Sequence, residues 1–162
     1  MWYRIRPAER RDASAIAEIR VLAWQQAYRG LLPDSILESL SVESDKIKIE
    51  ETFLNTDRKP LIVVCDDDDR PIGYCIWSDI EKKIELDAIY VHPDFQRQGA
   101  GSALVTAIMD QTKKSLCVWT IRNNASAIMF YQALGFFLDG SDRERKLGES
   151  LVCEIRLVRG RN

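Results

Sequence analysis

The residues between Glu85 and Gly101 hold most of the side chains that could do chemistry in this chain. An extended apolar run with two carboxylates, Glu85 and Asp87, ends in a turn, and a helix follows with Gly99 and Gly101 at its start. A helix start after a strand presents several unpaired backbone N–H groups and the positive end of the helix dipole to one point. Such a point suits a phosphate or pyrophosphate, and Arg97 adds a positive charge. A plain tight turn is the alternative that these residues alone leave open.

Residue spacing excludes two common phosphate-binding motifs and a serine hydrolase. A dinucleotide fingerprint needs a third glycine three positions after Gly101, where the chain has Leu104. A P-loop needs Lys followed by Ser or Thr after its last glycine, where Ser102 and Ala103 stand. His92 is the only histidine, and the chain has no G-x-S-x-G sequence for a serine nucleophile. The sequence therefore supports none of these three classes.

Two spaced motifs resemble the GCN5-related N-acetyltransferase (GNAT) family. The family's Gln/Arg-x-x-Gly-x-Gly/Ala pattern matches residues 96–101, which read Gln-Arg-Gln-Gly-Ala-Gly. Its Asn-x-x-Ala-x-x-x-Tyr-x-x-x-Gly-Phe pattern matches Asn124, Ala127, Tyr131 and residues 135–136. The order of the expected helices and strands also agrees with the family along nearly the whole chain.

The resemblance implies a binding site for acetyl-coenzyme A (acetyl-CoA). In the family this cofactor lies where the fourth and fifth strands, here 84–91 and 115–121, separate at a bulge. Backbone groups of Ile89 and Val91 would pair with its pantetheine arm, and Asn124 would bind the arm, cap the following helix, or do both. The implied cofactor-binding residues are Ile89, Val91, Gln96, Arg97, Gln98, Gly99, Ala100, Gly101, Ser102 and Asn124.

Glycine would serve this site because, without a Cβ, its backbone can approach a pyrophosphate closely. Gly101 is expected at the surface, at the start of a helix. We therefore expect valine at this position to obstruct the pyrophosphate while the core stays packed.

The resemblance also implies which residues are catalytic. An amine with a lysine-like pKa is only about 0.04 % deprotonated at pH 7, so a carboxylate near the thioester has to take its proton. Glu85, fourteen residues before Gly99, has the spacing of the catalytic glutamate in some branches of the family, and Asp87 lies on the same expected strand face. Tyr131 is the candidate that protonates, or hydrogen-bonds to, the departing thiolate. Solvent-facing carboxylates and a packing tyrosine are the structural alternatives.

The sequence does not identify the acceptor amine, and the acetyl group could reach it by either of two reaction paths. Trp24 and Tyr28 are the candidate acceptor-binding residues, because the family places its acceptor-binding segment at this helix end. Two carboxylates that face one cleft would favour a cationic acceptor. We expect direct transfer in a ternary complex; the rival is a relay through Cys117, whose burial in a strand would raise its pKa. A non-catalytic coenzyme A-binding domain is the alternative from another class.

Composition excludes several other partners. The 162 residues include 23 Lys+Arg and 25 Asp+Glu, and without a clustered basic tract they predict no nucleic-acid binding. Apolar runs such as 61–65 are far shorter than the roughly 18 residues of a membrane span, and early charges exclude a signal peptide, so we expect a cytoplasmic protein. The four cysteines lack a C-x-x-C pair and are expected as buried free thiols, with no metal. The resemblance implies acetyl-CoA and an amine as partners and is compatible with a homodimer.

The expected elements form a mixed α/β fold. Together with the resemblance, their order predicts a single acetyltransferase-like domain, 1–162, with a mixed, largely antiparallel sheet of about seven strands and helices on both faces. The aspartates at 66–69 are expected in a solvated hairpin turn, not a cation site. The expected strands are 2–6, 61–65, 71–78, 84–91, 115–121, one that starts at 136, and 151–158; the expected helices are 12–29, 34–54 with a break at 41–44, 99–112 and 124–134.

Overall fold

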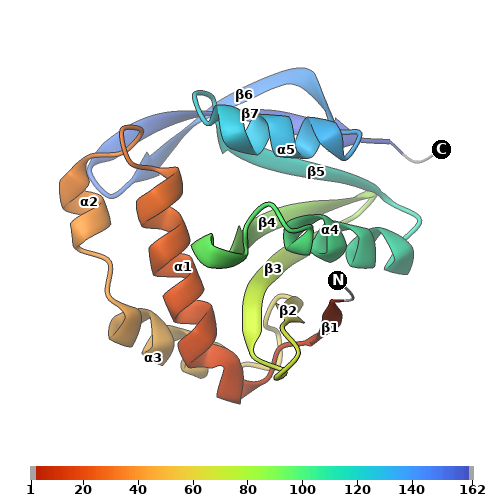
Figure 1. Cartoon of the computed structure of the whole chain (residues 1–162). Helices are drawn as coiled ribbons and strands as arrows, with labels where there is room; N and C mark the ends of the chain where they lie inside the picture. Colours follow the sequence, from red (N-terminus) through yellow and green to blue (C-terminus); the bar gives the residue numbers. More distant parts are fainter. Residues whose placement is uncertain (1–2, 161–162) are drawn as a thin grey trace.

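The computed structural model describes residues 3–160, which build one seven-stranded sheet flanked by helices (Figure 1). The strands are β1 (Arg4–Pro7), β2 (Leu61–Cys65), β3 (Pro71–Ile80), β4 (Lys83–Val91), β5 (Ser115–Ile121), β6 (Phe137–Leu147) and β7 (Ser150–Arg159). They lie in the order β1-β2-β3-β4-β5-β7-β6, and only β4 and β5 pair in parallel. The expected mixed, largely antiparallel sheet is confirmed. The expected strand at 2–6 is observed from Arg4 on, and Trp2 lies outside the described residues.

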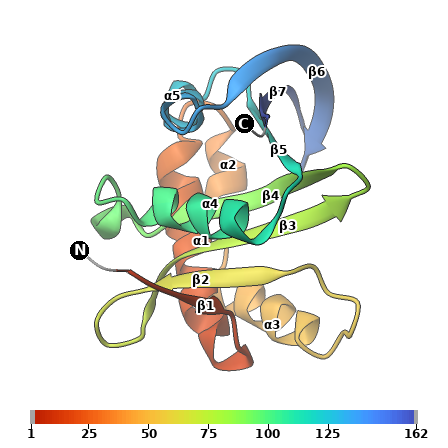
Figure 2. The same cartoon turned by 90° about the vertical axis from the view of Figure 1, so that its right-hand side faces the viewer.

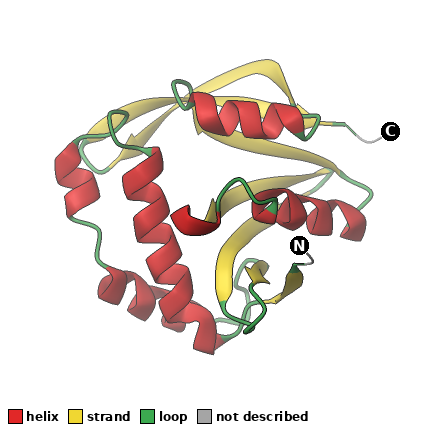
Figure 3. Cartoon of the chain, in the orientation of Figure 1, coloured by secondary structure: helices red, strands yellow, loops and turns green. Residues whose placement is uncertain are grey.

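Helices cover both faces of the sheet, as expected (Figures 2 and 3). They are α1 (Ala13–Ala27), α2 (Asp34–Glu38), α3 (Val42–Thr52), α4 (Ala100–Gln111) and α5 (Ala125–Ala133), with 3-10 turns at Arg10–Asp12 and Pro93–Phe95. In Figure 2, α4 lies in front of the strands, whereas α1, α2 and α3 lie behind them. Within residues 3–160, none of these helices is long and apolar enough to cross a bilayer.

The strand β2 shows why the sheet carries helices on both sides. All five of its residues are buried, and successive side chains of a strand point to opposite faces. Ile62 and Val64 pack into a cluster with α4, whereas Val63 packs with Ile16 and Ile19 of α1. A strand that is covered on both faces therefore reads as a continuous apolar run.

The helical region between residues 34 and 54 is broken, as expected. The helix α2 ends at Glu38, and Ser41 begins α3 by accepting a hydrogen bond at Oγ from the N–H of Ser44, at 3.2 Å. This N-cap satisfies one of the N–H groups that a helix start leaves without an intrahelical partner. The break turns the chain so that α3 can pack against α1.

The aspartates at 66–69 organise the turn between β2 and β3. Asp66 Oδ1 accepts hydrogen bonds from two backbone N–H groups of the turn itself. Asp69 accepts one from Arg6 Nε at 3.0 Å and forms ion pairs with two further arginines of the N-terminal segment. The expectation of a purely solvated turn is therefore wrong for Asp69, whose carboxylate ties the hairpin tip to the start of the chain.

An ion pair near the N-terminus is largely withdrawn from solvent. The guanidinium group of Arg6 donates to both carboxylate oxygens of Asp12, at 2.7 and 2.9 Å, and the two side chains are 10 % and 4 % exposed. Asp12 also accepts a hydrogen bond from the N–H of Glu9 at 2.8 Å. Burial alone would raise the pKa of Asp12, but the hydrogen bonds from Arg6 and Glu9 lower it below its ordinary value. The carboxylate is thus held in its ionised form.

Replacing Asp12 by alanine is expected to lower the free energy of unfolding by about 2–4 kcal/mol, because the largely buried Arg6 loses its bidentate partner and keeps only Asp69. Since folding lowers the pKa of Asp12, its stabilising contribution is present above about pH 4 and is lost as the pH falls through the folded-state pKa. Urea unfolding at pH 7 and at lower pH measures both effects. An equal loss for Glu18→Ala, whose ion pair with Arg70 is exposed, would contradict the prediction.

The four cysteines are free, and three of them are buried. Cys65, Cys75 and Cys117 lie in strands that are covered on both faces, in agreement with the expectation from their apolar surroundings. Cys153 is only half-buried, so the expectation of burial is wrong there. It belongs to β7, which lies next to the edge strand β6 at one end of the sheet.

Candidate active site

Strands β4 and β5 pair over a short stretch and then separate. Their parallel pairing ends at Leu86 and Val118. On the other side of β4, the register with β3 shifts between Ile76 and Trp77, which leaves Asp87 as an extra residue in β4. A bulge of this kind bends its strand, and Figure 1 shows β4 and β5 running apart. The separation at a bulge that the sequence resemblance implied is therefore present.

The separated strands contribute the wall of a cleft of about 940 Å³. Residues from α1, α5 and the turn before α4 complete the lining. This volume lies within the range of roughly 300–1,000 Å³ that is typical of ligand sites. The residues singled out by sequence that line the cleft are Tyr28, Asp87, Ile89, Val91, Gln96, Arg97, Gly99, Gly101, Ser102, Asn124 and Tyr131. Those outside the lining are Trp24, Glu85, Gln98 and Ala100.

The start of α4 forms one end of the cleft. The first hydrogen bond of this helix runs from the N–H of Ala103 to the carbonyl oxygen of Gly99, at 2.9 Å, so the N–H groups of residues 100–102 precede it. Gly99 has a φ of +94°, a left-handed conformation that glycine adopts without a steric penalty. Arg97 lines the same part of the cleft. Together with the positive end of the helix dipole, these groups can bind a phosphate or pyrophosphate.

Hydrogen bonds from side chains hold the turn that leads into α4. Gln96 donates from Nε2 to the carbonyl oxygen of Val91 at 3.0 Å, and Gln98 donates from Nε2 to that of Asp94 at 3.2 Å. The hydroxyl of Tyr3 donates to the carbonyl oxygen of Gln98 at 2.7 Å. The side chains of Gln96 and Gln98 thus position the backbone. A ligand that pairs with the carbonyl group of Val91 has to share it with Gln96.

Gly101 is closely packed in addition to being at a helix start. A Cβ atom there would lie 3.1 Å from Cζ of Phe130 on α5 and 3.7 Å from Cγ2 of Val91. Valine at this position therefore requires the half-buried ring of Phe130 to shift. A substitution at Gly101 changes packing and ligand approach together, so Arg97 offers a cleaner probe of anion binding.

The two candidate bases occupy different positions relative to the cleft. Asp87 lies in its wall, where Oδ2 accepts a hydrogen bond from Ser78 Oγ at 2.6 Å and lies 3.2 Å from Nζ of Lys59. Glu85 lies outside the lining, with Oε2 3.9 Å from Sγ of Cys117. The structure therefore brings Asp87, and not Glu85, to the point where the two strands separate.

Tyr131 is buried in α5 and lines the cleft. Its ring packs edge-on against Phe130 and Phe136, with centroid distances of 5.0 and 5.4 Å. Burial raises the pKa of Tyr131 well above its ordinary value. The phenol is therefore neutral near pH 7. It can donate a hydrogen bond to a group in the cleft, but it gives up its proton less readily than an exposed tyrosine.

Asn124 caps α5 and also lines the cleft. Its Oδ1 accepts a hydrogen bond from the N–H of Ala127 at 3.1 Å. The residue is buried, and its side-chain NH₂ group offers two donors to a ligand. The capping role and the ligand-binding role that the sequence left open are therefore compatible.

Aromatic residues extend the cleft toward α1. The hydroxyl oxygen of Tyr28 lies 3.2 Å from that of Tyr90, and the ring of Trp24 packs edge-on against Tyr28 at 5.0 Å. Burial raises the pKa of both tyrosines, so both hydroxyls are protonated near neutral pH. Tyr90, which was not predicted from the sequence, also lines the cleft. Strand alternation places its side chain on the face of β4 opposite to those of Ile89 and Val91.

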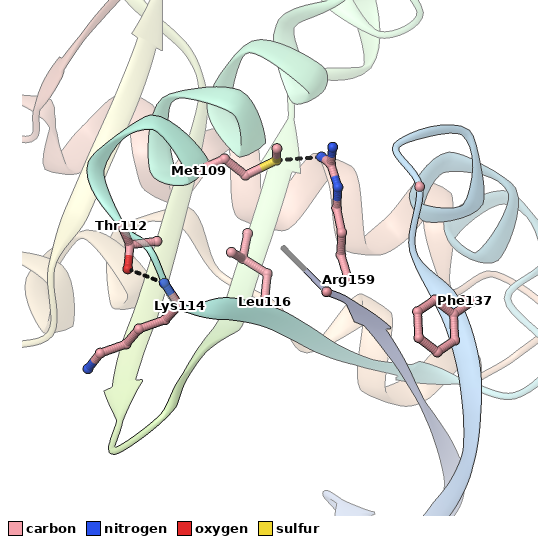
Figure 4. A pocket seen from close by; sticks show the side chains of 8 residues that line it. Met109, Thr112, Lys114, Leu116, Phe137 and Arg159 are labelled. Atoms are coloured by element: carbon pink, nitrogen blue, oxygen red, sulfur yellow. Dashed lines mark hydrogen bonds between the residues drawn. The ribbon is translucent and has the colours of Figure 1, made fainter. Parts of the chain in front are cut away.

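A second, smaller cavity of about 350 Å³ lies between the end of α4 and the strands β5, β6 and β7 (Figure 4). Arg159 donates a hydrogen bond from Nη1 to Sδ of Met109 at 2.6 Å, and the N–H of Lys114 donates to Oγ1 of Thr112 at 3.1 Å. None of the candidate catalytic, cofactor-binding or acceptor-binding residues lines this cavity, and of the two motifs only Gly135 reaches it. The candidate active site is therefore the cleft between β4 and β5.

The only histidine supports the turn that precedes α4. Nδ1 of His92 accepts a hydrogen bond from the N–H of Asp94 at 3.2 Å, which caps the 3-10 turn there.

Among residues 3–160, no group of three or more His, Cys, Asp or Glu side chains is arranged to hold a metal ion.

Relatives of this chain are N-acetyltransferases by name. The N-acetyltransferase YuaI of Bacillus subtilis is 30 % identical over 138 residues, which cover 80 % of this chain and 77 % of that protein. The probable N-acetyltransferase Rv2775 of Mycobacterium tuberculosis is 27 % identical over 143 residues, 85 % of this chain and 81 % of that one. The PaiA N-acetyltransferase of Thermoplasma acidophilum, solved with coenzyme A, has the same fold, with a TM-score of 0.71, 23 % identity, and coverage of 95 % and 98 % of the two chains.

A sequence profile of the acetyltransferase (GNAT) family matches residues 20–136, which include the whole of β4, α4, β5 and α5. The chain therefore belongs to the GNAT family. It is an N-acetyltransferase, and the alternative of a non-catalytic coenzyme A-binding domain is set aside.

Proposed function

We propose that this N-acetyltransferase moves an acetyl group from acetyl-CoA directly to a primary amine while both substrates are bound. The observation that carries the proposal is the cleft between β4 and β5, with Asp87 where the strands separate and a helix start at the other end. The two ends suit the thioester and the pyrophosphate of one long substrate. The coenzyme A complex of the PaiA enzyme, which shares the fold, supports the choice of acetyl-CoA.

Backbone groups that have no strand partner support the proposed position of the cofactor. Beyond Leu86 the edge of β4 that faces β5 is no longer paired, so Ile89 and Val91 are available to the pantetheine arm. The backbone amides of residues 98–102 are assigned to the pyrophosphate, with Arg97 as a further cation, and the NH₂ group of Asn124 is assigned to the arm. Gln98 and Ala100 contribute through backbone alone, in keeping with side chains that lie outside the cleft lining.

The chemistry needs a proton acceptor for the amine and a partner for the leaving sulfur. Acetyl-CoA supplies an acetyl group activated as a thioester. Asp87 takes the proton of the amine, directly or through a water, and Glu85 is the alternative base from the same strand. Tyr131, neutral because its pKa is raised, donates a hydrogen bond toward the position of the thiolate.

The acceptor is assigned as a cationic primary amine. Asp87 lines the cleft, and an ammonium group of the chain itself, Nζ of Lys59, lies 3.2 Å from its carboxylate. The carboxylate of the proposed base therefore already pairs with an alkylammonium group, which supports a cationic acceptor. Tyr28 forms the adjoining wall, and Trp24 supports it from behind.

The proposal is tested by mixing the purified protein with acetyl-CoA and a set of polyamines, amino acids and peptides with free amines, and following the release of coenzyme A thiol. At least one amine should accelerate release above hydrolysis and appear as the N-acetyl product by mass spectrometry. Tight coenzyme A binding without amine-dependent release across the whole set would overturn the proposal.

Arg97→Gln is expected to weaken coenzyme A binding by about three- to tenfold, since it removes one charge-assisted contact at the exposed end of the cleft. Arg97 has a φ of +58°, and glutamine meets the same backbone strain, so the free energy of unfolding should not change. Calorimetric titration at two salt concentrations measures the effect, which should shrink at high salt. The same loss for Arg10→Gln, far from the cleft, would contradict the assignment.

Cys117→Ala is expected to leave kcat within about threefold of the wild-type value, because direct transfer needs no covalent acyl-enzyme. Burial raises the pKa of the Cys117 thiol, with the nearby Glu85 carboxylate adding to the shift, so little of the nucleophilic thiolate is present at neutral pH. Steady-state kinetics, with coenzyme A affinity measured in parallel, makes the test. Abolished turnover in a folded variant that still binds coenzyme A would favour the relay instead.

A further inference from the structure

The ion pair between Lys59 and Asp87 places a primary amine of the chain at its own candidate active site. Nζ of Lys59 lies 3.2 Å from Oδ2 of Asp87, which lines the cleft where β4 and β5 separate. We propose that Lys59 is an internal acceptor, acetylated in cis by acetyl-CoA bound in the cleft. The inference rests on the proposed function, because it uses the same acetyl donor and the same carboxylate.

The amine and the acetyl donor are placed on different sides of β4. Lys59 lies in the segment just before β2, and β2 and β3 lie on one side of β4 in the sheet. The donor is assigned to the gap between β4 and β5, on the other side of that strand. Because Asp87 belongs to β4 and pairs with Lys59, the lysine can stay beside it while the donor is bound, as direct transfer requires.

The pair with Asp87 positions the Lys59 amine without holding it tightly. The Lys59 side chain is 58 % exposed, whereas that of Asp87 is 22 % exposed. Exposed ion pairs contribute little to stability, so the ammonium can leave the carboxylate at small cost. The remaining hydrogen bond from Ser78 to Asp87, at 2.6 Å, keeps the carboxylate in place when the lysine moves.

The transfer step balances with the groups already named. The Lys59 ammonium loses a proton to Asp87, and the free amine attacks the thioester carbonyl carbon. The N–C bond forms and the C–S bond breaks; the sulfur leaves as coenzyme A thiolate and takes up one proton, and the second proton goes to solvent. The products are N-acetyl-lysine, coenzyme A and one proton. Acetyl-lysine carries no charge, so it no longer pairs with Asp87, and the carboxylate becomes free for an external ammonium group.

A second lysine of the chain serves as an internal control. Lys114 also forms an ion pair with an aspartate, Asp79, and its side chain is 35 % exposed. Lys59 and Lys114 both lie outside the cleft lining, but the partner of Lys59, Asp87, belongs to the lining, whereas the partner of Lys114, Asp79, does not. Chemical acetylation by dissolved acetyl-CoA acts on any accessible lysine, so it modifies Lys114 without regard to the cleft, whereas acetylation in cis is confined to Lys59.

The test incubates the full chain with acetyl-CoA alone and follows both lysines by peptide mass spectrometry. Lys59 is expected to be acetylated at least about tenfold faster than Lys114, at a rate independent of protein concentration over about a 20-fold range. Excess coenzyme A, which fills the cleft without an acetyl group, should slow acetylation at Lys59 and not at Lys114. Asp87→Asn should slow it at Lys59 alone, and Lys59→Arg should remove the fast phase altogether.

Equal rates at Lys59 and Lys114, or a Lys59 rate that coenzyme A leaves unchanged, would overturn the inference without any variant. A Lys59 rate proportional to protein concentration would overturn it as well, since transfer would then occur between molecules. Parallel reactions with external amines separate the two hypotheses. Amine-dependent thiol release without Lys59 acetylation removes only the inference, whereas coenzyme A binding with neither reaction removes the proposed function too.

Discussion

Tyr131→Phe is expected to lower kcat by about 10²-fold while leaving the Kd for coenzyme A within about twofold. The substitution keeps the ring that packs against Phe130 and Phe136 and removes only the hydroxyl. A hydrogen bond to sulfur matters most when the C–S bond breaks and charge develops, so its loss falls on the transition state. Steady-state kinetics and a calorimetric titration of the same preparation separate kcat from binding.

The pH dependence provides a second readout for Tyr131. Because burial raises its pKa well above the ordinary value, the hydroxyl is neutral throughout the range in which the enzyme is assayed. Ionisation of Tyr131 should therefore cause no decrease in the wild-type kcat at pH values under about 10. The ratio of wild-type kcat to variant kcat should be constant over the same range. Tyr74→Phe is the matched control, since it removes a buried hydroxyl outside the cleft lining. An equal loss of kcat in both variants would point to packing.

Helices and strands whose bounds are set by neighbouring residues in the chain were predictable from the sequence. The strand β5 has the predicted bounds, 115–121, because an apolar run stands between polar residues on both sides. Asn124 caps α5 as predicted, and Gly135, with a φ of +83°, follows the end of that helix. These residues also carry the motif by which the family resemblance was found. The fold class and the general location of the site were therefore within reach of sequence alone.

Features that depend on the exact register between paired strands were not predictable from the sequence. The extra residue at Asp87 exists only relative to the register of β3, so a regular strand was expected, in which Glu85 and Asp87 are equivalent. Most of β6 was missed for a different reason: residues 139–146 are polar and mostly exposed, without an alternating pattern. That strand is held by its backbone pairing with β7. Close contacts such as Gly101 with Phe130, and Lys59 with Asp87, likewise appear only after folding.

The position of Asp87 leads to the second large expected effect. Asp87→Asn is expected to lower kcat/KM by about 10²- to 10³-fold, whereas Glu85→Gln should lower it by less than about tenfold. Asparagine keeps the size of the side chain but cannot take a proton from the amine or attract an ammonium group. Glutamine at position 85 changes a carboxylate that lies outside the cleft lining, beside Cys117.

The loss in Asp87→Asn should be largest at low pH and shrink as the pH rises. Below the pKa of the acceptor most of the amine is protonated, so the rate depends on a group that removes the proton; at high pH free amine is already abundant. Profiles of kcat/KM against pH for the wild type and both variants measure this. Asp79→Asn is the matched control, since Asp79 pairs with Lys114 away from the cleft and should leave the profile unchanged. A larger, pH-dependent loss in Glu85→Gln than in Asp87→Asn would instead make Glu85 the base. The amine's proton would then have to reach that carboxylate through water, because the bulge places Asp87 at the cleft and leaves Glu85 in the regular part of the strand.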